Sequence, residues 1–123
     1  GAWPTKALPR LPSAAMDDPI ELLSGDGTGA IRTIKSEDLN VNLVSWPAGG
    51  GVGEHVNDER DVLLVVVHGA MTLRVDGVAR DVSADHAVVV PKGSTRSIVA
   101  GADGVRYVSA HRRRPPLDIA RPA

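Results

Sequence analysis

The sequence predicts an all-β protein built as a sandwich or a barrel, and three observations carry that prediction. Short apolar or alternating runs recur along the chain, separated by Gly, Asp and Asn. The dipeptide Asp76-Gly77 lies between two such runs and is a strong signal for a two-residue β-hairpin turn. No segment shows the helical period of about 3.6 residues. Many short strands joined by polar turns are typical of antiparallel sandwiches and barrels.

The first strands are expected over residues 30–34 and 40–46. The second of these alternates, so that Asn42, Val44 and Trp46 share one face. The segment 47–51, which is Pro-Ala-Gly-Gly-Gly, is expected to interrupt the sheet.

The middle of the chain predicts a strand over residues 62–67 that is buried on both faces, because the run is continuously apolar. Residues 70–76 alternate and lead into the hairpin, and residues 78–82 form its return strand. Residues 87–90 make another buried run. Residues 97–100 and 105–110 complete the series and are expected to be joined by a turn over 101–104.

A chain of 123 residues is long enough for one domain with a single core. We expect a Pro-containing arm over residues 1–18, the β-domain over 19–111 and a tail over 112–123. The prolines of the arm disfavour helix and suggest a disordered or partly ordered segment. The alternative is an arm that packs on a partner subunit, with Trp3 as its anchor.

Composition excludes several classes of function. The net charge is −1, so no overall field attracts nucleic acid or membrane surfaces. The chain has no Cys, which excludes disulfides and thiolate chemistry. No apolar run approaches the ~20 residues that span a bilayer. We therefore expect a cytoplasmic protein with no nucleic-acid or membrane partner.

Two stretches carry the most information. Residues 51–69 read GVGEHVNDERDVLLVVVHG, and residues 91–96 read PKGSTR. Together they resemble the two signature motifs of the cupin superfamily, G-(five)-H-x-H-(three or four)-E-(six)-G and G-(five)-P-x-G-(two)-H-(three)-N. The resemblance covers roughly residues 41–110. It implies a cupin-type double-stranded β-helix, which is a small barrel related to the jelly roll.

The positions that shape the cupin backbone are mostly kept, whereas the positions that hold its metal are mostly replaced. Gly49, Gly69, Pro91 and Gly93 match the Gly and Pro positions, while Asp85 and Ala100 replace a Gly and an Asn. At the metal positions the chain has His55 for the first His, Asn57 for the second, Val62 for the Glu and Arg96 for the last His.

These replacements disfavour a metal. Val62 has no donor atom, and Arg96 is permanently cationic and cannot be a ligand. Asp61 precedes Val62 and replaces the Glu only with a one-residue register shift, because adjacent strand residues face opposite sides. We predict no cofactor. The alternative is a divalent metal held by His55, Asn57 and Asp61.

The resemblance implies that His55, Asn57 and Arg96 point into the barrel mouth. Arg is suited to bidentate recognition of carboxylate or phosphate. We predict a metal-free binding module for a small polar or anionic molecule, with Arg96 as anchor and His55 and Asn57 orienting the ligand. The competing interpretation is a polar network with no ligand, in which Arg96 pairs with Asp61 or Glu59.

Whether the protein is an enzyme stays open at this point. One alternative is a metal-dependent cupin enzyme of the dioxygenase or isomerase type with non-standard ligands. Another resembles the metal-independent sugar-nucleotide epimerases of the same fold, with His55 as the base. A third is a barrel that serves assembly only. Small cupins are commonly homodimers formed by sheet packing and exchange of N-terminal strands, and exposed sheet edges need cover, so we expect a homodimer.

Overall fold

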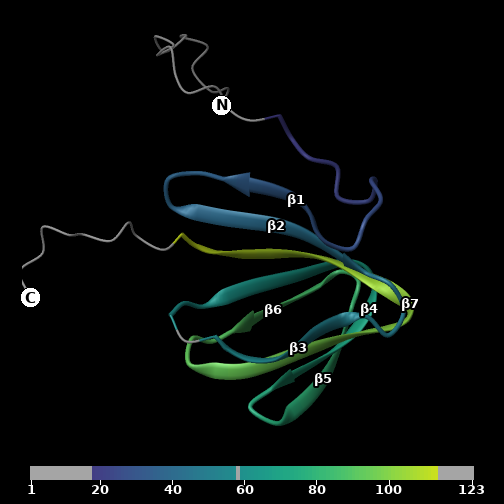
Figure 1. The fold of residues 1–123 in the computed structure, drawn as a ribbon, viewed down its shortest axis with the longest axis vertical. Helices are drawn as coiled ribbons and strands as arrows, with labels where there is room; N and C mark the ends of the chain where they lie inside the picture. Colours follow the sequence, from purple (N-terminus) through teal and green to yellow (C-terminus); the bar gives the residue numbers. More distant parts are fainter. Residues whose placement is uncertain (1–17, 58, 114–123) are drawn as a thin grey trace, which may run out of the picture.

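The structure, a computed structural model, describes residues 18–57 and 59–113. The expectations for the arm and most of the tail therefore lie outside the described residues. The described chain forms a seven-stranded antiparallel sheet that folds over on itself (Figure 1). The strands are β1 (Gly29–Lys35), β2 (Leu39–Trp46), β3 (Gly51–Asn57), β4 (Val62–Val75), β5 (Val78–Ser83), β6 (His86–Val90) and β7 (Ser94–Arg112).

The sheet makes two layers that share its two longest strands, β4 and β7. The first half of β4 pairs with β6 on one side and with the second half of β7 on the other. The second half of β7 also pairs with β2, and β2 pairs with β1. The second half of β4 pairs with β5 and with the first half of β7, which pairs with β3. The layers are thus β1-β2-β7-β4-β6 and β3-β7-β4-β5.

The two long strands change layer at a close backbone approach. The β4–β7 register shifts between Val66 and His68 and again between Gly69 and Met71. Gly69 has φ 72°, and a Cβ built on it would overlap the carbonyl oxygen of Gly104 on β7. Only glycine adopts that conformation at such a short separation without strain. Bulges of this kind bend a strand without ending it.

This bend corrects the expected strand boundaries. Residues 62–67 and 70–75 belong to one strand, with Asp76 already in the hairpin turn, and residues 97–100 and 105–110 likewise belong to one strand. The expected turn over 101–104 is strand, because its glycines serve the bend. The sequence also missed β3, since Gly51 and Gly53 are unfavourable in strands and the acidic residues around His55 resemble a loop.

The predicted hairpin is confirmed. Val75 pairs with Val78 across the two-residue turn. Asp76 has φ 49° and Gly77 has φ 82°, so both central residues are left-handed, as a type I′ turn requires. That turn matches the right-handed twist of the flanking strands.

The core fills the space between the layers and is almost entirely aliphatic. Tyr107 is its one aromatic member among the described residues, and Trp46 packs against the cluster from its edge. The buried cluster contains Val44, Val62, Leu64, Val66, Met71, Leu73, Val82, Val90, Ile98, Ala100, Val105 and Tyr107. The residues that the structure describes include no helix with the length and apolarity to cross a bilayer.

We predict that Gly69→Ala lowers the free energy of unfolding far more than Gly93→Ala. Both positions have positive φ, but only Gly69 faces a backbone atom, whereas a Cβ on Gly93 meets nothing within 4 Å. Urea denaturation should show a loss of roughly 1–2 kcal/mol for Gly93→Ala from φ strain alone. The loss for Gly69→Ala should be at least about 3 kcal/mol. Equal losses would show that the approach to Gly104 does not constrain the fold.

Candidate functional site

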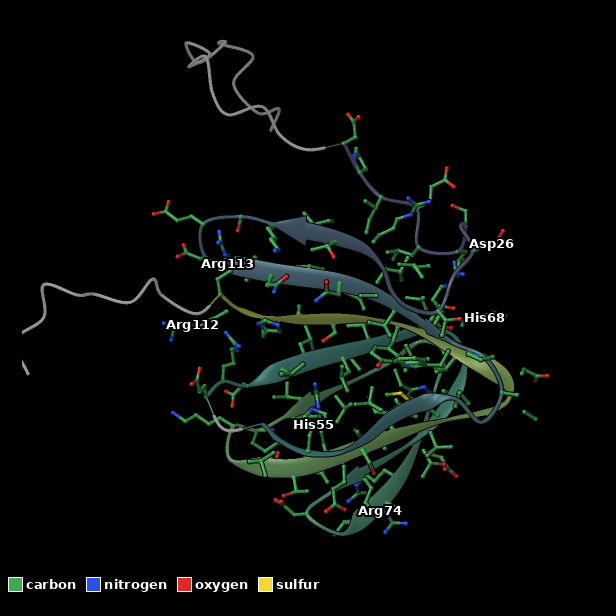
Figure 2. All side chains as sticks on the ribbon, viewed as in Figure 1. Asp26, His55, His68, Arg74, Arg112 and Arg113 are labelled. Carbon is green, nitrogen blue, oxygen red and sulfur yellow. The ribbon has the colours of Figure 1, made fainter. Side chains whose placement is uncertain are left out.

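His55 and Arg96 form a cross-strand pair on β3 and β7. The Nε of Arg96 donates to the Nε2 of His55 at 3.2 Å, and the Nδ1 of His55 lies 3.0 Å from the carbonyl oxygen of Gly53. A carbonyl only accepts, so Nδ1 carries a proton, whereas Nε2 accepts from Arg96 and carries none; the imidazole is therefore neutral. Figure 2 shows His55 between the two layers. Both ring nitrogens are therefore engaged, and the free base that an epimerase-like role requires is not available while Arg96 holds Nε2.

The Arg96 guanidinium is half-buried and incompletely satisfied. Its Nη1 is buried and has no hydrogen-bond partner among the described residues. Desolvation by burial lowers the pKa of Arg96, while the nearby Tyr107 phenol acts in the opposite direction. An unpaired buried donor costs about 1–3 kcal/mol, and more when it belongs to a charged group. Such a group in a native structure calls for a partner that the described residues do not supply.

Tyr107 lies near this guanidinium at the inner end of the site. The hydroxyl accepts a hydrogen bond from Trp46 Nε1 at 3.1 Å, and the residue is 3% exposed. Burial raises the pKa of the Tyr107 phenol, opposed by the Trp46 hydrogen bond and by the charge of Arg96. The phenol is therefore neutral at physiological pH and keeps its own proton for donation.

A cavity of about 230 Å³ opens between the layers at this point. β2 and the second half of β7 provide one wall, and Val52 and Arg96 come from the other layer. The polar groups on its wall come from β2 and from both halves of β7. The lining residues are Gly29, Ala30, Asn42, Val44, Trp46, Val52, Arg96, Tyr107 and Ser109.

The remaining predicted site residues lie in different places. Asn57 pairs with Ser94 near the end of the β3–β7 ladder, and its side chain lies outside what the structure describes. Val62 is 2% exposed and belongs to the core, so it is Val62, not Asp61, that faces the interior. Asp61 is exposed and accepts a hydrogen bond from the Lys92 N–H at 2.9 Å. Asp61 therefore fixes the turn after β6 rather than pairing with Arg96.

The described residues do not fit a cupin-type metal. Across residues 18–57 and 59–113, no group of three or more His, Cys, Asp or Glu side chains lies close enough together to hold an ion. The Nε2 of His55 faces a guanidinium N–H, and a guanidinium repels a divalent cation. The absence of a metal remains a prediction that elemental analysis must test.

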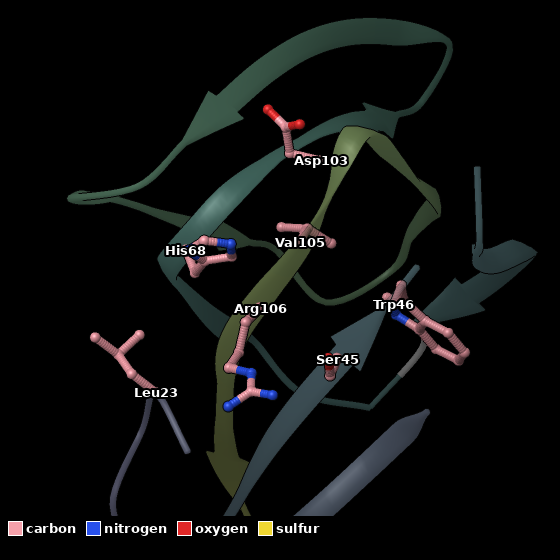
Figure 3. Close-up of a pocket in the computed structure, with 7 residues that line it drawn as sticks. All are labelled: Leu23, Ser45, Trp46, His68, Asp103, Val105 and Arg106. Atoms are coloured by element: carbon pink, nitrogen blue, oxygen red, sulfur yellow. The ribbon is translucent and has the colours of Figure 1, made fainter. Parts of the chain in front are cut away.

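A second pocket, of about 250 Å³, lies on the other side of Trp46, around His68 and Arg106 (Figure 3). The Arg106 guanidinium in this pocket already donates hydrogen bonds to the protein backbone. Arg106 donates to the carbonyl oxygens of Leu22, Ser24 and Gly25, at 3.3, 2.8 and 2.7 Å. This pocket thus holds the segment before β1 in place and offers a ligand fewer free donors than the Arg96 cavity does.

Sequence reasoning did not identify Asn42, Trp46, Tyr107 or Ser109 as site residues. One signal was present, since Asn42 falls on the same face of its strand as Val44 and Trp46. A polar residue on an otherwise inward face marks either a satisfied network or a ligand contact. Ser109 joins it only through the β2–β7 pairing, in which Asn42 lies opposite Ser109.

Comparison with known proteins gives a fold and no closer relationship. The sequence matches no protein-family model and none of the curated proteins. Its structure is similar to KdgF from Halomonas sp., with 22% identity, a TM-score of 0.63 and coverage of 69% of this chain and 78% of that one.

Two further solved structures agree. The cupin domain of Schizosaccharomyces pombe Cnp3 is 20% identical with a TM-score of 0.63, over 68% of this chain and 63% of that one. Protein NMB1881 from Neisseria meningitidis is 21% identical with a TM-score of 0.67, over 78% of this chain and 100% of that one. Identities this low establish architecture only. The predicted fold is thereby confirmed, and the chain has the cupin fold.

Proposed function

We propose that this protein binds a small organic anion, a carboxylate, inside the barrel without a metal, and that Arg96 is the anchor. One observation carries the proposal: Arg96 lines the cavity, and its Nη1 is buried without a partner among the described residues. A carboxylate offers the acceptor lone pairs that this guanidinium lacks. Arg–carboxylate pairs are charge-assisted and often bidentate, which adds both affinity and orientation.

The surrounding hydrogen bonds orient the anchor in advance. His55 Nε2 accepts a hydrogen bond from the Nε–H of Arg96, which leaves the two terminal nitrogens of the guanidinium for a ligand. The bond from His55 Nδ1 to the Gly53 carbonyl fixes the imidazole ring in turn. His55 is thus a positioning residue for Arg96. Groups held in place before binding lose less entropy when the ligand arrives. The orienting role of Asn57 stays a prediction.

We predict that Arg96→Met leaves the free energy of unfolding within about 1 kcal/mol of the parent chain, or raises it. Replacing an unsatisfied, partly buried charge by an apolar side chain of similar length is often neutral or stabilising, and residues kept for function often cost stability. Tyr107→Phe should instead lose about 1–2 kcal/mol, because it leaves the Trp46 Nε1 donor without its acceptor. Urea denaturation of both variants makes the comparison. A large loss in Arg96→Met would assign Arg96 a structural role instead.

We predict that Arg96→Met weakens the binding of lactate, measured by isothermal calorimetry on the full chain, at least tenfold. Charge-assisted hydrogen bonds contribute about 1.5–3 kcal/mol, and about 1.4 kcal/mol corresponds to tenfold. Arg74→Met is the matched control, because Arg74 is an exposed cation beside the β4–β5 hairpin and donates to the Gly77 carbonyl (Figure 2).

Equal lactate affinity in the parent chain and Arg96→Met would refute the anchoring role. Elemental mass spectrometry of the purified protein gives an independent check. A stoichiometric divalent ion that disappears in His55→Ala would overturn the metal-free proposal and would make oxygenase and isomerase assays the next step.

We also propose that two copies associate through the outer face of the layer β1-β2-β7-β4-β6. Strand pairing aligns apolar side chains in two rows across this face. The row that contains Leu43 is apolar up to β1, where the next side chain in line is Arg32. The rows are Val89-Leu63-Ala110-Val41 and Ala87-Val65-Val108-Leu43, and of these Leu43 is already fully buried. Leu63 is 41% exposed and Val89 is 55% exposed. The two rows carry no charged side chain before Arg32, so an interface centred on them would pair with itself under two-fold symmetry without burying a charge.

Light scattering at micromolar concentration should give the mass of a dimer for the parent chain and of a monomer for Leu63→Asp. The introduced carboxylate would lie in the centre of the proposed interface without a partner. Val78→Asp is the control, because Val78 is 58% exposed on β5 in the other layer. A monomeric parent chain, or a Leu63→Asp variant that stays dimeric, contradicts this interface.

A further inference from the structure

We infer that the Arg96 cavity selects short monocarboxylates that carry hydroxyl or keto oxygens, an inference that rests on the carboxylate-binding role proposed for Arg96. Three neutral polar groups face the same cavity, namely Asn42, Tyr107 and Ser109. Their existing hydrogen bonds determine which of their atoms remain free. The polar atoms without a hydrogen-bond partner among the described residues are mainly donors. They would therefore favour a ligand that has acceptor oxygens in addition to its carboxylate.

Asn42 offers its amide nitrogen. Thr33 on β1 is the cross-strand neighbour of Asn42, and its Oγ1 donates to the Oδ1 of Asn42 at 2.8 Å. The acceptor end of the amide is therefore engaged by the protein. The –NH2 end has two donors and no acceptor among the described residues.

The two hydroxyl groups on β7 add to this set. The Tyr107 hydroxyl accepts a hydrogen bond from Trp46, so its own O–H remains available to donate to a ligand. Burial keeps the phenol protonated. Ser109 lies opposite Asn42 in the β2–β7 ladder, and its side-chain hydroxyl has no hydrogen-bond partner within the described ranges. Its hydroxyl both donates and accepts, which suits a ligand hydroxyl.

The charges on the wall limit the ligand to one negative charge and no positive charge. Arg96 is the only permanently charged residue among those that line the cavity, and no Asp or Glu is present there. The ammonium of an amino acid would lose its hydration without meeting a carboxylate. A second carboxylate on the ligand would likewise be desolvated without a cation, which is costly.

The volume limits the size of the ligand. Drug-sized pockets measure roughly 300–1,000 Å³, and this cavity measures about 230 Å³. At about 30 Å³ per water molecule, it holds the equivalent of about eight waters. That is the scale of an acid with three to five carbons. Val44 and Val52 supply the apolar wall against which its carbon chain would lie.

The experiment compares five ligands of similar size by calorimetry on the full chain: glycerate, lactate, propionate, malonate and alanine. Each added neutral hydrogen bond should improve affinity about three- to tenfold. Glycerate should therefore bind most tightly, lactate next, and propionate at least about tenfold more weakly than glycerate. Malonate and alanine should bind more weakly than lactate. A tighter affinity for either of these two would overturn the assigned class.

Ser109→Ala tests the neutral contacts. It should reduce the preference for glycerate over propionate by about three- to tenfold and leave the affinity for propionate unchanged. Ser97→Ala on the same strand, outside the cavity, should leave the preference intact. Both changes are small, and circular dichroism checks that each variant is folded.

The outcomes separate this inference from the function on which it rests. If propionate and glycerate bind equally and both require Arg96, the hydroxy-acid class is wrong while carboxylate anchoring stands. An unchanged preference in Ser109→Ala contradicts the neutral contacts in the same way. If none of the four acids that lack an ammonium group binds, or if Arg96→Met binds them as well as the parent chain does, both proposals fail.

Discussion

The close approach of the Gly69 and Gly104 backbones is the constraint on which the rest of this structure depends. It lets β4 and β7 pass from one layer to the other, so that both layers share the same two strands. Because β7 bends there, Arg96 lies in one layer while Tyr107 lies in the other, and both face the space between. The bend that closes the barrel is therefore also what assembles the cavity.

The His55–Arg96 pair gives this barrel a permanent organic cation near the place where the cupin motif supplies metal ligands. The neutral imidazole accepts from the guanidinium instead of binding an ion. Partial burial makes that charge expensive to keep, as the unpartnered Nη1 shows. The same low-dielectric surroundings strengthen its attraction for an anion. Under the anchoring role proposed for Arg96, this charge weakens the empty protein and strengthens the complex, which is the balance expected of a binding residue.

The fold was predictable from this sequence to a greater extent than the site was. Alternation, the Asp76-Gly77 turn and the cupin-like spacing depend on neighbouring residues, so the sequence shows them directly. The choice between Asp61 and Val62 was not predictable, because a continuously apolar strand has no period of two that marks its inner face. The place of Ser109 in the site could not be predicted from the sequence for another reason. It reaches Asn42 only through the pairing of β2 with β7, which no local pattern records.

The proposed interface and the proposed cavity use opposite faces of the same two strands. Along β2, Val41 and the fully buried Leu43 lie on the side away from the cavity while Asn42 lines it, and along β7, Val108 and Ala110 flank Ser109 in the same way. A second copy packed on the outer face would hold these strands in one register. A fixed register keeps Asn42 opposite Ser109, and pre-organised donors bind more tightly than mobile ones. Assembly and ligand recognition in this protein would then depend on a single pair of strands.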